Sequence, residues 1–483
     1  MSKNLFVGVD GKARKAKEFY VGVNGKAHRI IKAYIGDENG KARPFWEKES
    51  NIAENSLEFV SDNSFTIKAS RYWDGTISYN NGNGNGWTTW DGSQISSGEI
   101  NGRQRIYFRG SRNENGRITP GSKTNSWKIT GSNVECNGNI ECLLDYQKVA
   151  AGKHPEMGIK CYKYMFADCS ALITAPQLPA PGAVEECYYG MFMNCSSLTT
   201  APALPAVTVG YGSYNSMFYG CSSLTTAPAL PAMYINNYSY YNMFYGCSSL
   251  TTAPALPATR LGTYCYYAMF QGCSSLTTAP ALPATSLEKS CYGYMFKNCS
   301  SLTTAPELPA AHAREDCYSS MFSGCSSLTT APALPAISLD RYCYSAMFYG
   351  CSSLTTAPEL PVTTLADYCY SSMFSNCSSL TTAPKLPATT LKDQCYGYMF
   401  KGCSKLTTVP ALPATKLTWA CYYEMFLEAI SISETQSEDY PTPYRIPTKG
   451  EGTKESNSLS NMFNITPNIN TTYYLPKGIS IIS

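Results

Sequence analysis

The dipeptide Met-Phe recurs at a constant interval over more than half of the chain. Eleven copies run from Met165 to Met425, each 26 residues after the one before, without an insertion or a deletion. A fixed period of this length is typical of solenoids, because one repeat cannot bury its apolar side chains alone and must stack on its neighbours. Residues 161–426 are therefore predicted to form an eleven-repeat solenoid.

Several columns hold a single residue type when the copies are aligned on Met. Tyr stands three residues before Met, and Phe one residue after it, in all eleven copies. Cys stands four before Met in nine copies, with Ser213 and Ser239 as exceptions, and four after it from Cys169 to Cys403. This spacing predicts a short helix with one buried face. The residue three after Met, which is Gly, Asn or Asp in ten copies, is expected to end that helix in the left-handed conformation.

The second half of each repeat reads Ser-Ser-Leu-Thr-Thr-Ala-Pro-x-Leu-Pro-Ala. Its fixed leucines, such as Leu198 and Leu204, predict a short strand followed by a proline-fixed turn. Each repeat is thus expected to hold one short helix, one short strand and two turns. With strands about 4.8 Å apart, eleven rungs would give a rod or shallow arc roughly 50 Å long. We interpret the Thr-Thr columns as strand formers rather than as a surface that orders water or ice.

The segment Phe-x-x-Cys-Ser-Ser-Leu-Thr, found for example from Phe218 to Thr225, resembles the BspA-like leucine-rich repeat family. The resemblance covers residues 161 to about 426, although 26 residues is longer than the commonest repeat of that family. It implies an α/β repeat solenoid and is compatible with a surface adhesin. Solenoid ends need caps. We expect an N-terminal cap at 127–160 and a C-terminal cap at 427–483 with a degenerate Met462-Phe463.

The first fifty residues carry a shorter repeat, with Asp-Gly or Asn-Gly between apolar residues. These dipeptides are strong hairpin signals, so residues 1–50 are predicted to form a small β-meander that docks on another protein. The motif resembles N-terminal modules of structural and tail proteins of phages that infect gut bacteria. The resemblance implies virion docking through the apolar residues of the repeat, which are Val7, Val9, Val21, Val23 and Ile35.

Residues 51–126 alternate apolar and polar side chains between turns rich in Gly and Asn. This pattern predicts a small antiparallel β-sandwich. Trp87 and Trp90 flank one of its turns, and we expect both in the core. The predicted fold class is therefore an α/β repeat solenoid preceded by all-β N-terminal modules.

The sequence offers no catalytic, metal or cofactor site. A net charge of +3 is too small to attract nucleic acid or anionic lipid, and we expect neither a secretion signal nor membrane insertion. Three histidines and the lack of nucleophile, phosphate-loop or zinc motifs argue against an enzyme. The 21 cysteines follow intervals of eight and eighteen residues in the solenoid, so we interpret them as buried free thiols. Stacked rungs would also bring them within reach of disulfide formation, and that alternative stays open.

Variation between repeats is concentrated at the residues flanking Met-Phe and in the loop before them. Tyr, Ser, Gly and Asn dominate there, as they do in antibody binding loops, where Tyr supplies large contact area at a low entropic cost. Drift on a solvated face would supply Lys and Glu instead. The candidate ligand-binding residues are Tyr189, Tyr219, Tyr241, Tyr245 and Tyr267.

A docking module, a spacer and a long repeat display together have the layout of an adhesin held on a larger particle. We expect a virion protein, a tail- or head-associated fibre, assembled in the cytoplasm of a bacterial host. Its N-terminal module would contact other virion proteins, and its solenoid would bind a glycan or protein of the host or mucosal surface. The alternatives are a surface adhesin of a gut bacterium and a virion spacer without a ligand.

Overall fold

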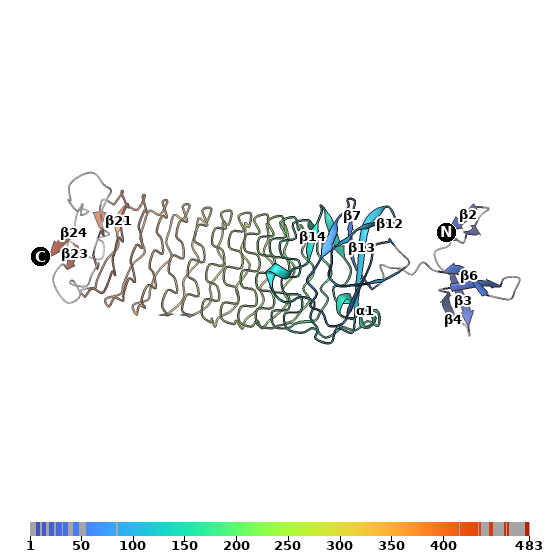
Figure 1. The fold of residues 1–483 in the computed structure, drawn as a ribbon. Helices are drawn as coiled ribbons and strands as arrows, with labels where there is room; N and C mark the ends of the chain where they lie inside the picture. Colours follow the sequence, from blue (N-terminus) through green and yellow to red (C-terminus); the bar gives the residue numbers. More distant parts are fainter. Residues whose placement is uncertain are drawn as a thin grey trace.

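The described part of the chain forms a long rod with a β-sandwich at one end (Figure 1). The computed structural model describes residues 55–432 except 84, 85 and 415, together with short strands and turns on either side of that range. The 26-residue repeats extend from the sandwich as a stack, in which each repeat forms one rung. We number the rungs by their methionines, so that rung 1 contains Met165 and rung 11 contains Met425, and we give positions relative to that Met.

The N-terminal strands form three separate two-stranded hairpins rather than one continuous meander. In the first two hairpins Val9 lies opposite Lys12 and Val23 lies opposite Lys26, and the predicted Asp-Gly and Asn-Gly turns between them lie outside the described residues. The proposed docking residues Val7, Val9, Val21, Val23 and Ile35 lie in the first strand of each hairpin, and their side chains lie outside the described residues. The strands are β1 (Phe6–Val9), β2 (Lys12–Lys15), β3 (Phe19–Val23), β4 (Lys26–Ile30), β5 (Lys32–Gly36) and β6 (Ala42–Glu47).

The sandwich consists of a seven-stranded and a three-stranded sheet. The larger sheet has the order β10-β9-β13-β7-β15-β16, with β12 also paired to β13, and the smaller has the order β11-β8-β14. Trp90 packs against Phe108 and Trp127 in the core, with ring centroids 4.9 Å away in both cases. Trp87 is instead half-buried under the guanidinium of Arg109. The strands are β7 (Leu57–Ser61), β8 (Thr66–Lys68), β9 (Thr76–Asn80), β10 (Thr88–Trp90), β11 (Ile95–Ser96), β12 (Gly98–Ile100), β13 (Arg103–Ser111), β14 (Lys128–Thr130), β15 (Val134–Asn137) and β16 (Leu172–Thr174).

The sandwich and the N-terminal cap are one unit, so the boundary predicted between residues 126 and 127 lies inside it. Strand β15 pairs antiparallel with β7 of the sandwich and parallel with β16 of rung 1. The amides of Ile118 and Trp127 donate to rung 1 carbonyls on either side of the same boundary. The helix α1 (Cys142–Ala150) packs on β13, and a single 3-10 turn, η1 (Lys123–Asn125), precedes β14.

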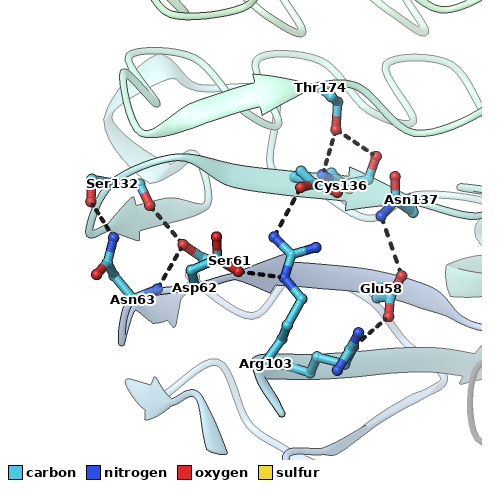
Figure 2. Close-up of polar contacts among 11 residues, drawn as sticks. Glu58, Ser61, Asp62, Asn63, Arg103, Ser132, Cys136, Asn137 and Thr174 are labelled. Atoms are coloured by element: carbon cyan, nitrogen blue, oxygen red, sulfur yellow. Dashed lines mark hydrogen bonds and ion pairs between the residues drawn. The ribbon is translucent and has the colours of Figure 1, made fainter. Parts of the chain in front are cut away.

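Polar side chains reinforce this junction on the outer face of the large sheet (Figure 2). The Arg103 guanidinium joins three strands, with Nε 2.7 Å from Asp62 Oδ1 and Nη2 3.0 Å from Glu135 Oε1. The amide of Cys136 donates to the Thr174 hydroxyl of rung 1 at 3.0 Å. The sheet therefore presents a preformed template on which the first rung pairs.

The predicted helix in each repeat is wrong, because this segment is a series of turns. In rung 4, Met243 N donates to Tyr240 O within the rung, but Phe244 N donates to Met269 O of the next rung. Amides alternate in this way along the segment, every second one bonding three residues back and the others bonding to the following rung. Half of the backbone donors therefore hold the stack together, which an α-helix could not allow.

The alternation requires a left-handed residue at every fourth position. In rung 4 these are Tyr238, Asn242 and Gly246, with φ values of 58°, 52° and 72°. The helix was predicted from apolar residues spaced three and four apart. Successive turns produce the same spacing, because each turn directs its apolar side chains to the interior of the solenoid. The expected left-handed residue three after Met is confirmed, but it ends a turn rather than a helix.

The conserved columns fill the interior as continuous ladders. The tyrosines at position −3 stack from Tyr162 to Tyr422, and the phenylalanines at +1 stack from Phe166 to Phe426, with rings nearly parallel in every pair after the first. Phe166 also contacts Phe59 of the sandwich, so the two cores are continuous. All 21 cysteines are buried, as expected, and all are free thiols.

The opposite side of each rung is extended chain with few regular strands. Single bridges join the threonines at position +9 from Thr174 to Thr382. The second threonine column, at +8, is also exposed. Short parallel pairs occur between β17 (Gly182–Ala183) and β18 (Thr208–Val209), β19 (His312–Ala313) and β20 (Ser338–Leu339), and β21 (Thr408–Val409) and β22 (Glu434–Thr435).

A partial twelfth rung covers rung 11. Tyr422 N donates to Ser458 O, and Phe426 N donates to Met462 O at 2.8 Å. Met462 is therefore the Met of this rung, as the degenerate Met-Phe motif suggested, and eleven additional residues precede it relative to the regular period. Two further strands, β23 (Tyr444–Pro447) and β24 (Ile479–Ile482), pair parallel with each other.

Candidate ligand-binding face

Rungs 2 to 5 form a band almost without charge. Between Glu186 and Glu288 the chain has one charged residue, Arg260. Ion pairs occur beside the band, where Lys163 Nζ lies 2.8 Å from Glu186 Oε2 and Lys289 Nζ lies 2.9 Å from Glu315 Oε1. We call residues 187–287 the uncharged band. Its polar surface consists of hydroxyl and amide groups with a single guanidinium.

The five candidate tyrosines belong to two different columns. Tyr189, Tyr241 and Tyr267 occupy position −2, whereas Tyr219 and Tyr245 occupy position +2. All five side chains are half-buried, because each lies against the equivalent position of a neighbouring rung or a nearby turn. The structure does not bring them together as one cluster.

Tyrosines at position −5 join the −2 column into a larger surface. Tyr241 stacks on Tyr267 with centroids 5.1 Å apart, and Tyr238 stacks on Tyr264 at the same distance. The two columns touch, because Tyr238 lies 5.8 Å from Tyr241 and Tyr264 lies 5.5 Å from Tyr267. Rings therefore line two adjacent columns over consecutive rungs.

Further tyrosines extend this surface at both ends. Tyr211 contacts Tyr238 at 5.6 Å, Tyr294 contacts Tyr267 at 5.1 Å, and Tyr164 contacts Tyr189 at 5.2 Å. The tyrosine strip, as we call it, comprises six tyrosines in unbroken ring contact over rungs 3 to 6 and the Tyr164–Tyr189 pair of rungs 1 and 2. Its members are Tyr164, Tyr189, Tyr211, Tyr238, Tyr241, Tyr264, Tyr267 and Tyr294.

Burial and neighbouring phenols raise the pKa of Tyr189 and of Tyr241 and keep these two side chains protonated. Burial raises the pKa of Tyr189, and the neighbouring phenols of Tyr164 and Tyr211 raise it further. Burial likewise raises the pKa of Tyr241, with Tyr189 among its contributing neighbours. Each hydroxyl therefore remains able both to donate and to accept a hydrogen bond at neutral and mildly alkaline pH.

The other two candidates form a separate pair. Tyr219 and Tyr245 stack with centroids 4.6 Å apart and planes 6° apart, and Gln271 Nε2 donates to the Tyr245 hydroxyl at 3.4 Å. Within the described part of the chain, no ring contact joins this tyrosine pair to the strip. Substitution of this pair is therefore a control for substitution of the strip.

Exposed apolar side chains accompany the strip in the same rungs. Val207 is 59% exposed, Met233 is 47% exposed and Tyr234 is 62% exposed. The Arg260 guanidinium lies 5.2 Å from the centre of the Tyr234 ring. The one cation of the uncharged band is thus engaged with an aromatic ring. Such apolar residues on a rim of hydroxyl and amide groups are typical of a binding surface.

Sequence reasoning missed five members of the strip. Tyr164, Tyr211, Tyr238, Tyr264 and Tyr294 lie at positions −1, −6, −5, −5 and −1. The helix prediction placed position −5 in a preceding loop and gave no reason to set it beside position −2. The turns, with left-handed residues at −5 and −1, bring position −5 beside position −2. The high density of Tyr in rungs 1 to 6 is the sequence signal that could have identified these five residues.

The described residues contain no group of three or more side chains suited to hold a metal ion. The cysteines, which would be the natural ligands, face the interior. Burial raises the pKa of Cys169 to about 11 and that of Cys299 to about 12. Of the described helices, none combines the length and apolarity needed to cross a membrane.

Comparison with known families supports the repeat architecture. The family model for the BspA type leucine rich repeat region matches six copies, over residues 153–277, 214–346, 243–381 and 341–439, which together cover more than half of the chain. No curated protein and no solved structure matches the chain.

Proposed function

The chain belongs to the BspA-type leucine-rich repeat family, and on that premise we propose that it is a non-enzymatic adhesion protein that binds its ligand through the tyrosine strip. The repeats are a rigid scaffold, because ladder stacking and inter-rung hydrogen bonds fix each rung against the next. Ligand contact on such a scaffold costs little conformational entropy. The proposal assigns binding to the strip and no catalytic step to any residue.

The observation that carries the proposal is the unbroken ring contact of six tyrosines over rungs 3 to 6, from Tyr211 to Tyr294, with the Tyr164–Tyr189 pair in the two preceding rungs. Eight tyrosines in such contacts are far more than solvation of a surface requires. Tyr presents a large amphipathic ring with only two rotatable torsions, which is why binding loops favour it. Stacked neighbours restrict those torsions further, so the rings are held in place before a ligand arrives.

We place the protein on a virion, as part of a tail- or head-associated fibre. What supports this is the order of its parts: hairpins resembling phage docking modules, a sandwich that templates rung 1, and a long repeat display. The hairpins would bind other virion proteins, and the strip would bind a host-cell or mucosal ligand. A surface adhesin of a gut bacterium, which the repeat family supports, is the second candidate.

Binding of the labelled full-length chain to a panel of intact gut bacteria tests the proposal. A triple variant, Tyr189→Ser, Tyr241→Ser and Tyr267→Ser, alters the strip. The matched control, Tyr219→Ser with Tyr245→Ser, alters the tyrosine pair. We expect selective binding that falls at least about tenfold, or ~1.4 kcal/mol, in the strip variant and stays unchanged in the control.

Failure of the chain to bind any cell would contradict the proposal and favour a ligand-free spacer. Equal loss in both variants would place the binding surface elsewhere. Antibody labelling of purified phage particles and of bacterial surfaces separates the two locations. Labelling of particles supports the fibre, and labelling of bacteria alone supports the bacterial adhesin.

A further inference from the structure

The charge distribution of the solenoid changes between its two halves. The uncharged band contains one charged residue, Arg260, whereas position −6, which holds Tyr211 in rung 3, carries a charged side chain in each of rungs 6 to 10. These side chains are Lys289, Glu315, Arg341, Asp367 and Asp393. Six of the eight strip residues lie within the band, Tyr164 precedes it and Tyr294 follows it.

The lack of charge restricts the ligands that the strip can recognise. Uronates, sialic acids, sulfated sugars and phosphate polymers are bound through Lys and Arg, which neutralise the ligand and make the affinity depend on salt. Arg260, the one cation of the band, lies over the Tyr234 ring. At the ends of the strip, Lys163 lies over Tyr189 and is paired with Glu186, and Lys297 lies over Tyr294. A charged polymer would therefore find few unengaged cations here.

Ring stacking within the columns determines which atoms the strip can offer. The planes of Tyr241 and Tyr267 differ by 3°, and those of Tyr238 and Tyr264 by 14°, so neighbouring rings cover each other's faces. The columns therefore offer ring edges, which carry partial positive charge, and phenol hydroxyls, which donate and accept. Both groups suit the hydroxyl and ether oxygens of a sugar.

The periodicity of the strip favours a polymer over a compact ligand. In each column the ring centroids of the stacked pair lie 5.1 Å apart, a spacing comparable to one pyranose residue in an extended chain. With rungs about 4.8 Å apart, the connected tyrosines of rungs 3 to 6 span roughly 15 Å, enough for about three sugar residues. A compact ligand would leave most of these equivalent positions unused.

We propose that the tyrosine strip binds a linear, uncharged polysaccharide laid along the axis of the solenoid. This inference rests on the proposed adhesion function and specifies its ligand. Each sugar residue meets the tyrosines of about one rung, and the Ser and Asn side chains between them complete the hydrogen bonds. Binding is insensitive to salt, because no ion pair contributes to it.

The test uses cells that the full-length chain binds and the polysaccharide extracted from them. Anion-exchange chromatography separates the extract into neutral and acidic fractions, which then compete with the cells for the protein at low and high salt. We expect the neutral fraction alone to inhibit binding, equally at both salt concentrations. Periodate treatment of the cells, which cleaves vicinal diols of sugars, should abolish binding, and protease treatment should not.

A matched pair of variants ties the result to the strip. Tyr238→Ser with Tyr264→Ser removes one column from the uncharged band, whereas Tyr342→Ser with Tyr368→Ser removes a stacked pair at the same position of rungs 8 and 9. Both should melt at similar temperatures. The first should weaken inhibition by the neutral fraction at least about tenfold, and the second should leave it unchanged.

Cell binding that resists periodate, or that only the acidic fraction inhibits, would overturn the polysaccharide inference and leave the adhesion function standing. An absence of cell binding would instead remove the proposed function itself, and the inference with it. Equal weakening in both variants would show that the neutral polysaccharide binds outside the strip.

Discussion

Cysteine plays an unusual part in this interior at the scale of single residues. The thiol of Cys221 donates to Phe192 O of the preceding rung at 3.1 Å, and the same contact recurs at position +4 through most of the stack. At position −4, where Ser213 and Ser239 replace Cys, the hydroxyls donate to the carbonyls of Gly210 and Asn236 three residues back. A buried Ser at this position therefore has a hydrogen-bond acceptor within reach, as a buried hydroxyl requires.

The cysteines should be unreactive in the native protein. Thiolate is the reactive form, and burial raises the pKa of Cys169 to about 11 and that of Cys142 to about 12, so the thiolate fraction at neutral pH is very small. Since the folded pKa is raised, reactivity should appear only as the pH approaches these values or as the protein unfolds. Thiol titration should find almost no reactive group at pH 7 and mostly free thiols in denaturant. A majority of paired cysteines would contradict this expectation.

The turn is the structural element that distinguishes these rungs from helical repeats. Sequence columns predicted which residues are buried, and Tyr162, Met165, Phe166 and Cys169 are all in the core. The columns could not predict the backbone conformation, because consecutive turns and a helix both bury side chains that are three and four residues apart. The left-handed positions gave little signal, since Tyr238 and Ala346 occupy them as well as Gly. Tertiary bonding between rungs overrides the intrinsic preference of such residues.

Gly246 provides a direct test of the turn geometry. Its φ is 72°, and a Cβ there would meet only Gly220 Cα, at 3.8 Å, so a side chain has space but the backbone is strained. Gly246→Asn should cost little, because Asn194 and Asn298 already occupy this column. Gly246→Val should destabilise the solenoid by about 1–2 kcal/mol more, because β-branched residues avoid the left-handed region. Thermal and urea melting of both variants measures the difference, and equal stability would contradict the assigned geometry.

Continuity between the sandwich and the repeats defines the molecule as a whole. The period and the sandwich were predictable from repetition and alternation. Their fusion was not, because the pairing of β15 with both β7 and β16 depends on segments distant in sequence. The same limit applied to the candidate site. Sequence identified tyrosine-rich positions, yet only stacking of rungs shows that Tyr189, Tyr241 and Tyr267 share a surface that Tyr219 does not.

The fused junction predicts how the chain can be divided. A fragment starting at residue 127 lacks β7 and β13, so β15 and the first rung would lose their template and expose the Phe166 ladder. A fragment starting at residue 52 keeps the whole sheet. We expect the shorter fragment to aggregate and the longer one to stay soluble and melt cooperatively, as followed by size-exclusion chromatography and thermal melting. Equal solubility and melting of the two would show that the sandwich is a dispensable spacer.

Exchange of a single rung tests most directly whether the tyrosine strip is the binding surface. Replacing residues 233–258 by the sequence of residues 311–336, with Tyr kept at position +2, preserves the Tyr, Met and Phe ladders and Tyr245 but removes Tyr234, Tyr238 and Tyr241 and introduces charge into the band. The same sequence placed at residues 363–388 is the control, since it leaves the strip intact. Both proteins should fold with similar melting temperatures, because each rung contacts only its neighbours. We expect cell binding to be lost in the first protein and retained in the second, and full binding by the first would show that the tyrosine strip is not the binding surface.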